Sequence, residues 1–203
     1  MQKSSYFIVN GITLYRVLVA PLLLFLILTN RPEWFKWLLA ISFFTDAIDG
    51  FLARKYKVVS VMGAKLDSIG DDLTVVAGVI GLFVFKGDFI SQQYIWLLFL
   101  LSLFVIQVIS AFTRYRAITS FHTYLAKLAA VFQGVFLILA FFTPEPILLL
   151  FYMAVAVTAL DLLEEIVLTF MLPEWKANVK GIYWVLKQRN NTLLLLLPGL
   201  FFM

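Results

Sequence analysis

The chain has 203 residues, of which 63% are hydrophobic and only 14% are charged. A soluble fold of this size could not hide 21 Phe, 8 Tyr and 5 Trp without exposing large apolar patches to water. Composition therefore excludes secreted, disordered and fibrous proteins and indicates a membrane protein. The net charge of +4 is small, so the Lys and Arg residues are better explained as topology signals than as a nucleic-acid surface.

The chain has no Cys and a single His. Disulfides and thiolate metal sites are therefore excluded, as is a metal site with several histidines on one chain. Any metal ion bound by this chain must be held by oxygen atoms.

Apolar stretches recur along the chain at the length that a helix needs to cross the hydrocarbon core of a bilayer. They cover residues 12–29, 34–51, 66–85, 94–112, 124–142 and 147–172. Short polar or Pro-containing connections separate them, so neighbouring helices should pack against each other. We therefore predict an all-α integral membrane protein with six transmembrane helices, organised as a single domain over residues 1–203.

Most positive charges fall on one side of this predicted topology, which places both termini in the cytoplasm. After the last predicted span, residues 174–189 alternate aromatic or aliphatic side chains with Lys and Arg. This pattern is typical of a helix lying among lipid headgroups, and equally of a tail that carries topology charges. We expect an interfacial segment over about residues 173–203.

Acidic side chains occur in two of the predicted spans, where their energetic cost indicates function. Asp46 and Asp49 are three residues apart in the second span and share a helix face. Asp67 and Asp71 are four apart in the third span and share one as well. Four carboxylates gathered near the cytoplasmic surface would repel one another unless cations lie among them. Since oxygen ligands select hard ions, we predict one or two Mg²⁺ or Mn²⁺ ions.

Metal ions in a carboxylate site are typical of chemistry at phosphorus. Gly50, Ala53 and Gly63 lie among the acids, where small side chains let a phosphate group or a neighbouring helix approach the backbone. Arg54 is placed to hold a diphosphate through two hydrogen bonds. Asp72 is rotated off the face of the other acids and is interpreted as a supporting residue or charge partner. The alternative is that the acids cap helices and pair with nearby Arg and Lys.

Residues 46–71 read DAIDGFLARKYKVVSVMGAKLDSIGD, which is D-x2-D-G-x2-A-R-x8-G-x3-D-x3-D. This pattern resembles the signature of the CDP-alcohol phosphotransferase family, integral membrane enzymes of phospholipid synthesis. In the first predicted span, Asn10, Thr13 and Arg16 are similar to the N-x2-T-x2-R opening common in the phosphatidylglycerophosphate synthase branch.

The resemblance implies that the four paired Asp residues hold the metal and that Asp71 is also the general base. It implies a binding site for the CDP-linked lipid made by Gly50, Ala53, Arg54, Ser60, Gly63, Asn10 and Thr13. It further implies a homodimer in a bacterial inner membrane, with the active site facing the cytoplasm.

The implied reaction moves the phosphatidyl group of CDP-diacylglycerol to an alcohol and releases CMP. Arg114, Arg116 and Lys127 could form a cationic pocket for an acceptor phosphate, which favours glycerol 3-phosphate. The two Arg residues could equally be ordinary positive-inside charges. Inositol phosphate, serine and phosphatidylglycerol are the alternative acceptors.

Asp161, Glu164 and Glu165 form a second acidic cluster on the last predicted span. We expect them to pair with Arg114, Arg116 or Lys127 rather than to lie at the membrane surface. A divalent-cation transporter is an alternative from another functional class, since intramembrane carboxylates also suit ion conduction. It predicts acids spread over several helices near the bilayer midplane, whereas the paired Asp residues lie at one end of two consecutive helices.

Overall fold

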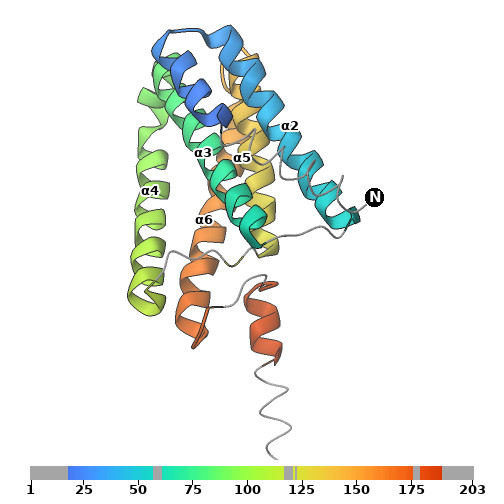
Figure 1. Cartoon of the computed structure of the whole chain (residues 1–203). Helices are drawn as coiled ribbons and strands as arrows, with labels where there is room; N and C mark the ends of the chain where they lie inside the picture. Colours follow the sequence, from blue (N-terminus) through green and yellow to red (C-terminus); the bar gives the residue numbers. More distant parts are fainter. Residues whose placement is uncertain (1–17, 57–60, 117–120, 122, 176–178, 189–203) are drawn as a thin grey trace, which may run out of the picture. The chain divides into compact units, whose positions relative to one another are not determined.

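The computed structural model describes residues 18–56, 61–116, 121, 123–175 and 179–188, and within these ranges residues 46–56, 61–69, 71 and 72 are described by their backbone alone. All regular secondary structure in this part of the chain is helical, which confirms the predicted class. The helices are Leu18–Leu28, α2 (Pro32–Tyr56), α3 (Val61–Phe85), α4 (Gly87–Tyr115), α5 (Tyr124–Phe142), α6 (Leu148–Met171) and a short helix over residues 182–188 (Figure 1).

The helices follow the predicted apolar stretches, and α5 has the predicted bounds. α2, α3 and α4 extend beyond the predicted stretches. Among the described helices, α4 and α5 are each long and apolar enough to cross a membrane, whereas Leu18–Leu28 and Leu73–Phe85 are shorter apolar segments. The arrangement with six spans and cytoplasmic termini stays a prediction.

The turn before α2 fixes where that helix begins. Asn30 has a φ of 52°, and the N–H groups of Asn30 and Arg31 donate to the carbonyls of Ile27 (3.0 Å) and Leu26 (2.9 Å). This pairing ends the preceding helix with the two hydrogen bonds of a Schellman motif. Pro32 then begins α2, a position where its missing N–H costs nothing.

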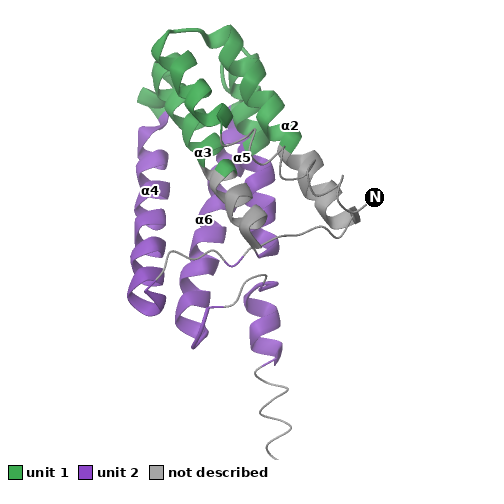
Figure 2. Ribbon diagram, viewed as in Figure 1, with its two compact units in different colours: residues 1–92, 134–147 green, residues 93–133, 148–203 purple. Residues whose placement is uncertain are grey.

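The contacts divide the chain into two compact units (Figure 2). The first contains residues 1–92 and 134–147, and the second contains residues 93–133 and 148–203. α4 and α5 each contribute to both units. The predicted single-domain organisation stays a prediction.

In the first unit, α3 packs closely on α2 and on the second half of α5. Phe35 of α2 is fully buried, and its ring lies 5.5 Å from that of Phe85 and 5.0 Å from that of Phe141. Gly81 of α3 lies under this ring, because a Cβ there would stand 2.6 Å from Cζ of Phe35. The absence of a side chain at Gly81 therefore sets the close approach of α2 and α3.

We expect Gly81→Ala to lower stability by about 1 to 3 kcal/mol, because the buried Phe35 ring is held on two sides and cannot yield. The melting temperature in detergent measures this effect. Gly87→Ala is the matched control, since a Cβ at Gly87 would meet no heavy atom of the described residues within 4 Å, chain neighbours aside. Equal melting temperatures for the two variants would contradict the packing described above.

Candidate active site

The paired acids of the sequence motif lie on the two helices on which they were predicted. Asp46 and Asp49 are on α2, and Asp67 and Asp71 are on α3. Of the other residues of the motif, α2 carries Gly50, Ala53 and Arg54, and α3 carries Gly63. The side chains of these residues lie outside the described part of the structure, as do Asn10, Thr13 and Ser60 entirely.

α2 and α3 run antiparallel and contact each other within the first unit (Figure 1). Their described halves fix the register between them. Phe35 lies against Gly81, and the buried hydroxyls of Ser42 and Thr74 are 3.2 Å apart and hydrogen-bonded. Thr74 also donates to the carbonyl of Gly70 at 2.8 Å. The Ser42–Thr74 bond joins the two helices one helical turn before the first acid of α2.

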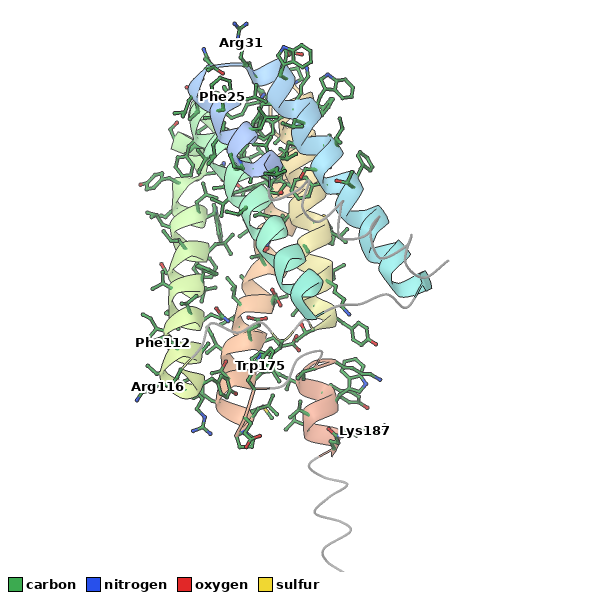
Figure 3. All side chains as sticks on the ribbon, viewed as in Figure 1. Phe25, Arg31, Phe112, Arg116, Trp175 and Lys187 are labelled. Carbon is green, nitrogen blue, oxygen red and sulfur yellow. The ribbon has the colours of Figure 1, made fainter. Side chains whose placement is uncertain are left out.

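The three cationic residues predicted for acceptor binding lie at helix ends in the second unit. Arg114 is in the last turn of α4, and Arg116 follows it with a φ of 59° (Figure 3). Lys127 is in the first turn of α5, where its Nζ lies 5.5 Å from the centroid of the Tyr124 ring. All three side chains are exposed. Positions at helix ends suit both topology charges and an acceptor site, so the acceptor role stays a prediction.

The second acidic cluster has partners that the sequence analysis did not foresee. Glu165 is buried, and its two carboxylate oxygens accept hydrogen bonds from the side-chain amide of Gln107 (2.8 Å) and the main-chain N–H of Phe121 (3.1 Å). Glu164 accepts from the main-chain N–H of Ile182 at 3.1 Å. These hydrogen-bond donors are amide groups, whereas we expected pairing with Arg114, Arg116 or Lys127.

These contacts give the cluster a structural role in the second unit. Glu165 links α6 to α4 and to Phe121, three residues before α5, while Glu164 links α6 to the short C-terminal helix. Oδ1 of Asp161 and Oε2 of Glu164 are buried and find no hydrogen-bond partner among the described residues. The available sequence signal was the presence of three acids in one apolar helix, which indicates a special role without naming the partners.

We expect Glu165→Leu to destabilise the protein by about 1 to 3 kcal/mol, because the buried N–H of Phe121 loses its acceptor. Glu165→Gln should cost less, since one amide oxygen can still accept that bond and Gln107 can rotate its amide to complement the other group. Thermal unfolding in detergent compares the variants. A Leu variant as stable as the wild type would show that Phe121 does not depend on this carboxylate.

The Asp motif resembles that of a class of membrane-bound transferases, and comparison with known families gives the same class. The family model for CDP-alcohol phosphatidyltransferases matches residues 6–170. This range covers most of the chain, including the whole motif at residues 46–71. The chain belongs to the CDP-alcohol phosphatidyltransferase family, whose members are membrane proteins.

Curated relatives differ in the acceptor that their names state. The chain is 44% identical over 66 residues to a CDP-diacylglycerol–inositol 3-phosphatidyltransferase of Saccharomyces cerevisiae, covering 32% of this chain and 30% of that protein. It is 31% identical over 86 residues to a CDP-diacylglycerol–glycerol-3-phosphate 3-phosphatidyltransferase of Rickettsia typhi, covering 41% and 47%. It is 36% identical over 81 residues to a CMP-forming cardiolipin synthase of Streptomyces coelicolor, covering 36% and 37%.

Each of these matches spans less than half of the relative's length. No solved structure matches the chain.

Proposed function

We propose that this protein transfers the phosphatidyl group of CDP-diacylglycerol to glycerol 3-phosphate and releases CMP. The observation that carries the proposal is the intact Asp motif on two antiparallel, contacting helices inside the range that matches the family. The active site is proposed to face the cytoplasm of a bacterial inner membrane, because Arg54 and Lys55, near the end of α2, lie on that side of the predicted topology. The homodimer stays a prediction.

The register of α2 and α3 supports a single cluster of carboxylates. From Phe35 to Ser42 is seven residues along α2, and from Gly81 to Thr74 is seven residues back along α3. A further seven residues in each helix lead to positions 49 and 67, both of which are Asp. Positions 46 and 71 then fall within one helical turn of that level.

This donor set fits a hard divalent cation. Asp46, Asp49, Asp67 and Asp71 would hold it, because carboxylate oxygens are the ligands that Mg²⁺ and Mn²⁺ prefer. When bound, such an ion neutralises the diphosphate of the CDP-linked lipid and stabilises negative charge that develops on its oxygens.

Other residues of the motif have separate roles in the proposed reaction. Arg54 binds the diphosphate with a planar pair of N–H donors. Asp71 accepts the proton of the acceptor hydroxyl as that oxygen attacks the β-phosphorus. A bond forms between the acceptor oxygen and this phosphorus, the bond to the CMP oxygen breaks, and CMP leaves. Gly50 and Gly63 leave room for the nucleotide phosphates beside the backbone.

The acceptor is assigned from charge and from the relatives. Arg114, Arg116 and Lys127 are exposed cations at the ends of α4 and α5, and the names of several relatives state glycerol 3-phosphate. A panel of glycerol 3-phosphate, inositol phosphate, serine and phosphatidylglycerol, each assayed for CMP release, tests the assignment. We expect the highest kcat/KM with glycerol 3-phosphate, and a preference for an uncharged alcohol would contradict it.

We expect Lys127→Met to raise the KM for glycerol 3-phosphate about ten- to a hundredfold, the equivalent of a charge-assisted hydrogen bond of about 1.5 to 3 kcal/mol. The KM for CDP-diacylglycerol should change little, because the acceptor alone loses a contact. Lys36→Met is the matched control: Lys36 also lies 5.5 Å from the centroid of an aromatic ring, that of Phe142. An unchanged acceptor KM in Lys127→Met would remove Lys127 from the acceptor site.

A further inference from the structure

The C-terminal segment is built into the second unit by main-chain hydrogen bonds. The N–H of Val179 donates to the carbonyl of Phe121 at 3.1 Å, and the N–H of Tyr124 donates to the carbonyl of Lys180 at 3.4 Å. Ile182 and Val185 pack on a core that includes the fully buried Phe121. Residues 179–188 are therefore seated on the beginning of α5 and the end of α6.

Gly181 and Glu164 fix the direction of this segment. Gly181 has a φ of 142°, a conformation that L side chains rarely adopt. A Cβ at this position would also stand 2.9 Å from the Glu164 oxygen Oε1, which accepts the hydrogen bond from Ile182. The helix of residues 182–188 thus starts at a defined point and in a defined direction.

The outer surface of the docked segment is aromatic and cationic. Tyr183, Trp184 and Leu186 are exposed, and the Trp184 ring lies 5.4 Å from that of Tyr124 and 5.5 Å from that of Tyr183. Around these rings lie two exposed lysines of the segment, of which Lys187 is on the last turn of the short helix (Figure 3). We call this surface the C-terminal patch; it consists of Tyr124, Lys180, Tyr183, Trp184, Leu186 and Lys187.

The C-terminal patch lies at the beginning of a helix that is able to cross a bilayer. Tyr124 is the first residue of α5, a helix long and apolar enough to span a membrane, and a membrane-spanning α5 would place the patch where that helix meets the headgroups. Tyr and Trp side chains at this depth place their rings among the acyl chains and their polar atoms among the headgroups. The charged residues described within 179–188 are both lysines, which suits a negatively charged surface.

We propose that the C-terminal patch binds the surface of anionic lipids in the leaflet where α5 begins. Trp184, Tyr183 and Leu186 enter the boundary between headgroups and acyl chains. Lys180 and Lys187 contact the lipid phosphates. The proposal concerns a surface of the second unit and does not depend on the transferase activity.

A single introduced cysteine tests the proposal, because the chain has no Cys of its own. Leu186→Cys carries a polarity-sensitive fluorophore, and the protein is reconstituted in vesicles of phosphatidylcholine or of an equimolar mixture of phosphatidylcholine and phosphatidylglycerol. Quenching by lipids spin-labelled near the headgroup reports contact with the bilayer, and quenching by iodide reports contact with water. We expect strong lipid quenching and weak iodide quenching, most clearly in the mixed vesicles.

Two variants test separately the lysine charges and the position of the helix. Replacing Lys180 and Lys187 with Gln should reduce lipid contact in the mixed vesicles alone, by about fivefold in partition for each charge, given about 1 kcal/mol per basic residue near an anionic surface. Gly181→Ala should reduce lipid contact in both vesicle types, because the helix of residues 182–188 would no longer start at the same point and in the same direction. Strong iodide quenching of the label in the Leu186→Cys protein, without the further substitutions, would overturn the proposal. Protection from both quenchers would also overturn it, because it would show that protein rather than lipid covers the patch.

Discussion

Asp71→Asn is expected to reduce turnover by about 10² to 10⁴-fold while the protein still binds the CDP-linked lipid, because a positioned general base contributes a factor of this size. In the proposed reaction Asp71 takes the proton of the acceptor hydroxyl, and an amide cannot. Binding depends mainly on the other carboxylates and on Arg54. The measurements are the rate of CMP release and, separately, the binding of a CDP-linked lipid.

The neighbouring acid provides a matched control. Asp72 also lies on α3, but one residue of helical rotation carries it off the face shared by Asp67 and Asp71. Asp72→Asn makes the same change in charge and should retain most of the activity. If Asp71→Asn kept more than about a tenth of the wild-type rate, it would lack the effect that a general base has. The proton would then have to be accepted elsewhere.

Removal of divalent cations is expected to abolish CMP release, with a loss of at least about a hundredfold, because a metal ion supplies several kcal/mol of charge stabilisation to phosphoryl chemistry. Added Mg²⁺ or Mn²⁺ should restore the rate. Asp49→Asn, which removes one proposed ligand, should raise the concentration of metal needed for half-maximal activity. Full activity in excess EDTA would contradict a metal site made by the paired Asp residues.

The sequence predicted the helices well because hydrophobic length and periodicity depend on local residues. The stretch 124–142 coincides with α5, and the acids predicted on two consecutive helices lie on α2 and α3. Pro32 at the start of α2 acts through its own backbone, so its effect is also visible locally.

Contacts between distant segments were not predictable in this way. Glu165 finds its donors at Gln107 and Phe121, and neither spacing nor charge points to an amide more than forty residues away. Lys86 donates to the carbonyls of Thr143 (2.9 Å) and Pro144 (2.8 Å). Both side chains satisfy main-chain or amide groups that become neighbours only after the helices have packed.

The hydrogen bonds of the second acidic cluster illustrate the same point. Opposite charges in a sequence suggest pairing, yet a buried carboxylate can be satisfied equally by amide donors. Glu164 and Glu165 accept such bonds, while Lys127 lies over the ring of Tyr124 at the exposed end of α5. Charge alone therefore identified the unusual residues but not their contacts.

The most direct test of the proposed function follows both products of one reaction. Purified protein in lipid vesicles receives CDP-diacylglycerol, Mg²⁺ and radiolabelled glycerol 3-phosphate, and CMP and labelled lipid are measured together. The proposal predicts that label enters the lipid fraction in equal amount to the CMP released, and that both products fall together by about 10² to 10⁴-fold with Asp71→Asn. CMP release without labelled lipid, or the absence of CMP with every acceptor of the panel, would contradict a phosphatidyl transfer by this protein.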